Sequence, residues 1–156
     1  MRKRIISPKL NATAAQQPWL NLERTASVEV TSEDNAFPIE SALSQEAAKG
    51  WRAAEAGVQT IRLIFDQPQS LKRISLVFVE MEVSRTQEFI LRWSPDRGNS
   101  FREIVRQQWN FSRPDATRET EDYAVELSNV TLLELIIEPD KENRKARASL
   151  LSLHLA

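Results

Sequence analysis

Cysteine is absent from this chain of 156 residues, which excludes disulfide frameworks, thiolate nucleophiles and cysteine zinc sites. Glycine occurs only three times, too rarely for a glycine-rich loop that cradles phosphate. The single histidine, His154, leaves no obvious parts for a catalytic triad or a histidine zinc site. No apolar run approaches the length of a membrane span.

The charges are nearly balanced, with 21 basic and 22 acidic residues and a net charge of -1. This balance makes no strong electrostatic case for anionic lipid or nucleic acid, so we expect no direct binding of nucleic acid. The start of the chain is basic, but Pro8 and Lys9 follow before any long apolar run, unlike a signal peptide. We therefore predict a cytoplasmic protein with no membrane span, and the sequence gives no oligomeric state.

Apolar residues alternate with other residues in several short runs, as half-buried β-strands require. The runs cover residues 58–65, 71–79, 89–93, 123–127, 133–137 and 151–155. Turn-forming residues separate them, at 66–69, 94–99, 128–129 and 138–140. Long stretches with a helical period of 3.6 are missing. The pattern predicts an all-β sandwich or barrel.

The N-terminal third is less regular. Residues 26–31 have the pattern of a strand. Residues 38–48 have a helix-forming composition, with Pro38 near the start and Gly50 after the end, and predict one short helix. We expect residues 1–23 to be an N-terminal extension that packs on a domain formed by residues 24–156.

The order of these elements resembles a discoidin, or coagulation-factor C-type, domain of the galactose-binding-like group. The most specific segment is Trp-Ser-Pro-Asp-Arg-Gly-Asn-Ser-Phe at residues 93–101, which resembles the family's strand, Ser-x-Asp-Gly turn and following aromatic residue. The resemblance covers residues 24 to 156. It implies a jelly-roll β-sandwich of about eight strands. In this family, loops at one end bind sugars, phospholipid headgroups or proteins.

The chain departs from that family in two respects. Many sugar-binding members hold a structural calcium ion in the loop before the tryptophan, but the matching stretch, residues 44–51, contains Glu46 as its only acidic residue. Calcium prefers six to eight oxygen ligands, usually with several carboxylates. We therefore expect no metal site and no cofactor. The disulfide of extracellular members is also missing.

A second, shorter similarity concerns residues 51–61. This segment is similar to part of the N-terminal jelly-roll domain of the eukaryotic single-strand-break-repair scaffold protein. The likeness implies an intracellular interaction domain and suggests a link to DNA repair.

The best candidate for a binding site is the segment 107–118, which reads as a turn. It contains Trp109 and Phe111, which could stack on a ligand, and Arg113 and Arg118, which could bind hydroxyl, carboxylate or phosphate oxygens. Arg52 is a further candidate, because it could face the binding end. The alternative is that Trp109 and Phe111 continue a strand and pack together on its core face.

Other chemically interesting residues have simpler interpretations. We expect Trp51 and Trp93 in the core and His154 on the outer face of the last strand, and we leave Trp19 undecided between a sheet-edge cover and a contact. The mixed-charge segment 141–147 reads as a solvated loop that could touch phosphate groups.

Glu80 and Glu82 would project the same way from a strand end. Paired carboxylates can act as acid and base in glycoside hydrolysis, but a solvated face is the favoured interpretation.

The sequence therefore predicts a non-catalytic module that binds a carbohydrate or another small polar ligand. The alternative is an intracellular protein-interaction or scaffold domain. An enzyme is disfavoured, because only the two glutamates support one.

Overall fold

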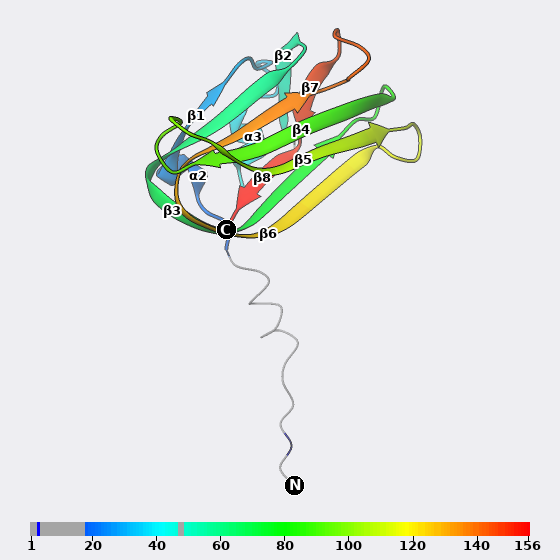
Figure 1. Ribbon diagram of the computed structural model, residues 1–156. Helices are drawn as coiled ribbons and strands as arrows, with labels where there is room; N and C mark the ends of the chain where they lie inside the picture. The colour runs from blue at the N-terminus through cyan, green and yellow to red at the C-terminus, as the bar shows by residue number, and fades with distance from the viewer. Residues whose placement is uncertain (1–2, 4–17, 47–48) are drawn as a thin grey trace.

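A computed structural model of the chain describes residue 3, residues 18–46 and residues 49–156, and it consists mainly of β-strands (Figure 1). The predicted extension at residues 1–23 lies mostly outside the described residues. The elements are α2 (Leu22–Thr25), β1 (Ala26–Val30), α3 (Glu40–Leu43), β2 (Trp51–Ala56), β3 (Gln59–Val79), β4 (Arg85–Ser94), β5 (Arg102–Phe111), β6 (Arg118–Glu138), β7 (Arg147–Leu150) and β8 (Ser152–Leu155). The eight strands in the described part agree with the predicted number.

Two long strands, β3 and β6, form the centre of the fold and pair antiparallel along most of their length. The first half of β3 also pairs with β1, and its second half also pairs with β8. The C-terminal part of β6 pairs with β4, which carries β5 on its other side. The strand order in the main sheet is therefore β1-β3-β6-β4-β5, with β8 beside β3 and with β2 and β7 as a separate pair.

The predicted strand ends at 66–69 and 128–129 are wrong, because β3 and β6 continue through them. The register between the two strands shifts there, between Ile64 and Arg73 of β3. Asn129 has a φ of 59°, a left-handed conformation that asparagine tolerates better than most residues. Residues that usually form turns thus make bulges inside bent strands, where the hydrogen-bond ladder is already interrupted.

The core lies between the inward faces of these strands, where every second residue is buried. Its largest fully buried side chains include Trp51, Phe65, Phe78 and Phe89. The rings of Phe78 on β3 and Phe89 on β4 are 5.2 Å apart and tilted by 30°, a favourable aromatic contact between two strands that do not pair. Trp51 and Trp93 are buried as predicted.

Trp19 and Leu20 cover the last strand. The backbone N–H of Leu20 donates to the carbonyl of Leu155, at 2.7 Å. The Trp19 ring lies 5.4 Å from that of His154 and 4.7 Å from the guanidinium of Arg73, so Trp19 covers a sheet. One ring nitrogen of His154 lies 3.0 Å from the carbonyl of Ser44. His154 does point to the outer face, but it is half-buried rather than solvated, because these segments pack over it.

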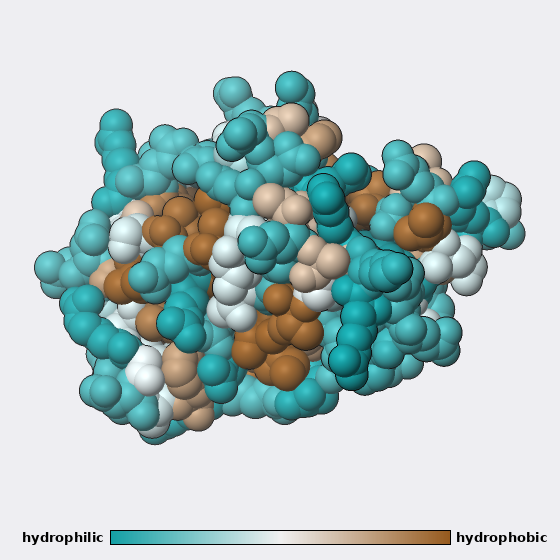
Figure 2. Space-filling model, turned by 90° about the horizontal axis from the view of Figure 1, so that it is seen from above, coloured by the Kyte–Doolittle hydropathy of each residue, from teal (hydrophilic) through white to brown (hydrophobic). Residues whose placement is uncertain are grey.

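The short helix α3 falls inside the predicted range 38–48 but spans a single turn. Residues 47 and 48, which the prediction included, lie outside the described residues. Gly50 follows with a φ of +73° and returns the chain toward β2. Figure 2 shows one face of the molecule, on which hydrophobic residues form separate patches enclosed by hydrophilic ones. No helix in the described part is long and apolar enough to cross a membrane.

Candidate functional site

Several loops gather at the end of the sandwich where β3 ends and β4 begins (Figure 1). They are the β3–β4 loop, residues 80–84, the β5–β6 turn, residues 112–117, and the β6–β7 loop, residues 139–146. The start of β2 lies beside them. This end of the molecule holds two neighbouring hollows.

The first hollow has a volume of about 410 Å³ and the second about 310 Å³. They share Arg52, Glu80, Glu82 and Ser149, so we treat them as one loop-end cleft. The first is also lined by Phe37, Lys49, Trp51, Val79, Met81, Arg118, Leu150 and Leu151. The second is also lined by Val83, Ser84, Asp140, Asn143, Lys145, Ala146 and Arg147.

The turn before β2 sets the orientation of the first wall. A Cβ on Gly50 would lie 2.5 Å from the carbonyl oxygen of Leu150, so only glycine lets the two backbones approach this closely. Trp51 then points inward, and its indole N–H donates to the carbonyl of Ser32 at 3.1 Å. Arg52, next in the strand, points outward, and its guanidinium lies 5.0 Å from the centre of the Phe37 ring.

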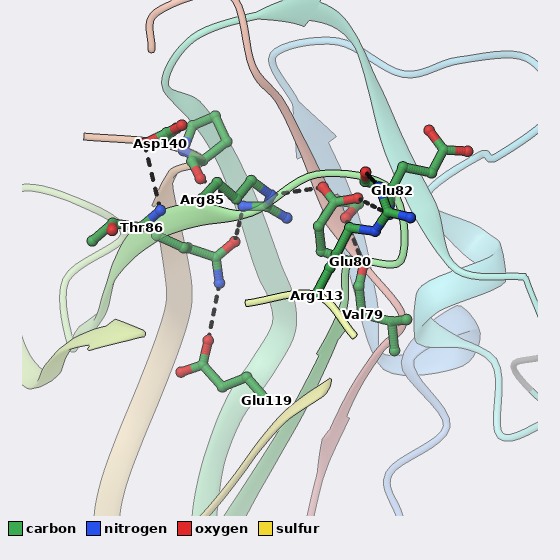
Figure 3. A network of polar contacts seen from close by, with 11 residues as sticks. Val79, Glu80, Glu82, Arg85, Thr86, Arg113, Glu119 and Asp140 are labelled. Carbon is green, nitrogen blue, oxygen red and sulfur yellow. Dashed lines mark hydrogen bonds and ion pairs between the residues drawn. The ribbon is translucent and has the colours of Figure 1, made fainter. Parts of the chain in front are cut away.

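Buried Arg85 holds the second wall in place (Figure 3). Its side chain is 1% exposed, and its Nε donates to Glu80 Oε1 at 2.7 Å. Its Nη1 donates to Gln87 Oε1 at 3.0 Å and to the carbonyl of Pro139 at 2.6 Å. The guanidinium also lies 4.7 Å from the centre of the Phe111 ring. One side chain therefore ties the β3–β4 loop to the β6–β7 loop.

The hydrogen bonds of Arg85 continue through Gln87 to a buried carboxyl group in the interior. Gln87 Nε2 donates to Glu119 Oε1 at 3.1 Å, and Glu119 is fully buried. Burial, and then the neighbouring Glu121 carboxyl, raise the pKa of Glu119 to about 8. Glu119 is therefore mainly protonated at neutral pH. Its Oε2, Nη2 of Arg85 and Nε1 of Trp109 are buried without a partner among the described residues.

Burial and the Glu121 carboxylate also raise the pKa of Tyr123, whose hydroxyl donates to Glu121 at 2.9 Å. The tyrosine therefore stays neutral at physiological pH.

The predicted site residues separate into two groups. Arg52 and Arg118 line the loop-end cleft. Arg113 lies on the neighbouring turn, where its Nη1 donates to the carbonyl of Glu82 at 2.6 Å and supports the β3–β4 loop. Phe111 is buried under Arg85, and Trp109 is half-buried against the core.

The interpretation of segment 107–118 as a turn is therefore wrong for its first half, which belongs to β5. The alternative is confirmed: Trp109 and Phe111 share one face of a strand and pack inward. The physical reason is the register with β4, which places Phe111 opposite Arg85 and Trp109 opposite Gln87.

Sequence reasoning missed the cleft residues Phe37, Lys49 and Met81. It named the charged segment 141–147, of which Asn143, Lys145 and Arg147 line the cleft. It also named Glu80 and Glu82, but Glu80 is half-buried and paired with Arg85 rather than solvated. The alternation of apolar Met81 and Val83 with polar neighbours was the available sequence signal for this loop, and both side chains are exposed in the fold.

The residues that the structure describes contain no group of three or more histidines, aspartates and glutamates that could hold a metal ion. Glu46, the single acidic residue of the stretch that resembles the calcium loop, is exposed, and its backbone N–H donates to the Ser44 hydroxyl at 3.2 Å. The donor set therefore does not fit calcium.

No protein-family model matches the chain, and no curated protein sequence matches it. Solved structures do match. A pectin-binding carbohydrate-binding module is 16% identical with a TM-score of 0.61, over 85% of this chain and 90% of that one. The CBM32 module of AlyQ, in complex with 4,5-unsaturated mannuronic acid, is 15% identical with a TM-score of 0.61, over 85% and 95%.

A third match is the module CpGH89CBM32-5 from Clostridium perfringens, in complex with GalNAc-beta-1,3-galactose. It is 18% identical with a TM-score of 0.62, over 88% of this chain and 98% of that one. The predicted galactose-binding-like jelly roll is thereby confirmed as the fold. These matches give no support to the similarity of residues 51–61 to the repair scaffold.

Proposed function

We propose that this protein is a non-catalytic carbohydrate-binding module and that its sugar binds in the loop-end cleft. The observation that carries the proposal is a cleft with converging polar groups at the loop end of a fold that carbohydrate-binding modules share. Fold alone does not fix function, so the chemistry of the cleft has to suit a sugar.

A sugar presents hydroxyl groups on its edges and apolar C–H groups on its faces. The cleft supplies both kinds of partner. Arg52 and Arg118 are hydrogen-bond donors, and the Ser149 hydroxyl both donates and accepts. Phe37 and Met81 provide apolar surface beside them.

Binding suits this cleft better than hydrolysis. Glycoside hydrolysis requires two carboxyl groups on opposite sides of the scissile bond. Glu80 and Glu82 come from a single loop. Glu80 is also engaged, because it accepts from Arg85 at 2.7 Å and from the backbone N–H of Glu82 at 3.2 Å.

Isothermal titration with a panel of neutral and acidic oligosaccharides tests the proposal, with Arg52→Ala as the cleft variant. We expect at least one sugar to bind and Arg52→Ala to raise its Kd by about tenfold or more, since a lost hydrogen bond from a charged group costs about 1.5–3 kcal/mol. Arg52 is exposed, so its removal leaves the core intact.

Lys72→Ala is the matched control, because Lys72 is exposed on β3 near the C-terminal residue, away from the cleft. It should leave the Kd unchanged. Equal losses in both variants would contradict the assignment of the cleft. A panel without any binding would contradict the function and favour the protein-interaction alternative, for which Met81 and Val83, 63% and 52% exposed, offer an apolar contact.

A further inference from the structure

The loop-end cleft carries an excess of positive charge that the whole chain does not have. Its lining contains three carboxylates, Glu80, Glu82 and Asp140. Against these stand five cations, namely Lys49, Arg52, Arg118, Lys145 and Arg147. The chain as a whole has a net charge of -1, so the excess is local to this cleft.

The cations of the cleft have no carboxylate partner within the fold, although Arg52 also lies over the Phe37 ring. None of the five forms an ion pair with another residue in the described part of the chain, whereas six other basic residues do. All five are exposed. Five unpaired positive groups repel one another, and such an arrangement is stabilised when an anion binds among them.

Two of the three carboxylates of the cleft accept hydrogen bonds from residues outside the cleft lining. Arg85, itself buried and outside the lining, neutralises Glu80 at 2.7 Å. Asp140 accepts from the backbone N–H groups of Glu142 and Thr86, at 3.1 and 3.4 Å. Figure 3 shows the Glu82 carboxylate directed away from Arg85. Glu82 is thus the one carboxylate of the lining to which the described residues supply no donor.

We infer that the cleft selects anionic saccharides, that is, sugars that carry a carboxylate or a sulfate group, over neutral ones. This inference rests on the proposed function. Arg52 and Arg118 supply planar guanidinium groups that bind a carboxylate or sulfate through two parallel hydrogen bonds. Arg85 acts as a positioning residue, because it removes the charge of Glu80 from the field that an anionic ligand meets.

The test compares pairs of ligands with the same sugar backbone, of which one member carries acidic groups and the other does not. Titrations use trigalacturonate and its full methyl ester, and in parallel a sulfated galactan oligosaccharide and its desulfated form. We expect an anionic member to bind at least about tenfold more tightly than its neutral counterpart, and the arm in which this occurs identifies the acidic group. Its affinity should fall as NaCl is raised, since salt screens exposed charges.

Two exposed cleft residues provide variants with opposite expected effects. Arg118→Gln should weaken binding of the anionic sugar about tenfold and weaken binding of its neutral counterpart less, because glutamine keeps a hydrogen-bond donor and loses only the charge. Glu82→Gln should strengthen binding of the anionic sugar by removing the unpaired carboxylate. Glu126→Gln is the control, because Glu126 is exposed on β6 and outside the lining of the cleft.

Equal affinity for charged and neutral partners, or a preference for the neutral ones, would overturn charge selection and leave the proposed function standing. No binding by any member of either pair, or by the neutral sugars of the earlier panel, would overturn both. Equally tight binding of inorganic phosphate, lost in Arg118→Gln, would also overturn the inference, because the cleft would then recognise an anion without its sugar.

Discussion

Glu119 is a carboxylic acid held among apolar and polar side chains in the interior, with one oxygen bound by Gln87 and the other unpartnered among the described residues. In the unfolded chain a glutamate has its ordinary pKa near 4.5, whereas in the fold the pKa is about 8. The stability that this group contributes is therefore fully present below the unfolded pKa. It is lost as the pH rises through about 8.

We expect Glu119→Gln to remove this loss, because glutamine has the shape of the protonated acid and nothing to ionise. Between about pH 5 and about pH 9 the wild type should lose at least ~1 kcal/mol of unfolding free energy relative to the variant, since one pKa unit corresponds to about 1.4 kcal/mol. Urea unfolding at several pH values measures this difference. Glu126→Gln, on the exposed face of the same strand, should keep the wild-type dependence of unfolding free energy on pH. The same dependence in Glu119→Gln would contradict the prediction, because Glu119 would then already be ionised.

Gly50 combines a positive φ of 73° with a backbone contact that leaves no room for a Cβ. Gly50→Ala should therefore destabilise the fold by about 2 kcal/mol or more, by left-handed strain and by displacement of β7. Gly57 has a φ of +92°, but a Cβ there would meet its nearest atom at 4.0 Å, so Gly57→Ala should cost only about 1–2 kcal/mol.

Thermal unfolding of the two glycine variants separates strain from clash, because about 1 kcal/mol corresponds to roughly 2–4 °C in Tm for a chain of this size. Similar Tm values for both would show that the approach of Leu150 to Gly50 does not matter.

Individual residues differ in how far the sequence predicts their environment. The buried position of Trp93 follows from alternation within its own strand, and that of Trp51 was expected from the resemblance to the discoidin pattern. The burial of Arg85 does not, since its partners Glu80 and Pro139 reach it only through the packing of two loops. The alternation of β4 places Arg85 on the same face as Phe89 and Leu91, but no local pattern shows that its charged end is buried as well.

At the level of strands, alternation finds the buried faces but not where a strand ends. Turn residues in the middle of β3 and β6 form bulges, and local composition does not separate a bulge from a loop. Strand β5 was predicted only as the alternative interpretation of Trp109 and Phe111, for a different reason. It lies at a sheet edge, where only one side is paired, and Gln107 interrupts its apolar face while Arg106 and Gln108 face solvent.

Asn129 offers a direct test of the bulge in β6. Asn129→Val should destabilise the protein by about 1–3 kcal/mol, because a β-branched residue resists a positive φ. Asn129→Gly should cost less than about 1 kcal/mol. Asn129 is exposed, so lost packing does not explain a difference between the two variants in chemical unfolding. Equal costs would contradict the role of its backbone conformation.

In the molecule as a whole, β3 and β6 each take part in both halves of the sandwich. The first half of β3 and the C-terminal part of β6 pair with each other and with β1 and β4, whereas the second half of β3 and the first part of β6 pair with each other beside β8. Unfolding of one half would therefore disrupt the strands of the other. We expect a single calorimetric unfolding transition whose calorimetric and van't Hoff enthalpies agree. Two separate transitions, or an enthalpy ratio well above one, would show that the halves unfold independently.

The candidate site is likewise a property of the whole molecule. Arg52 and Arg118 come from segments far apart in the chain, and sequence reasoning selected both without knowing that they share a cleft. The cleft itself is formed by five separate segments, so its volume and its surplus of cations emerge only from the packed fold.

The central pairing of β3 with β6 affects how fast the chain folds. Arg62 and Glu134, partners across these strands, are 72 positions apart in the chain. A topology dominated by such distant contacts folds slowly, over milliseconds to seconds. On the ribosome, β3 emerges long before β6 and leaves hydrogen-bonding groups open to wrong neighbours. The period of greatest exposure to aggregation is therefore the interval of synthesis between these two strands.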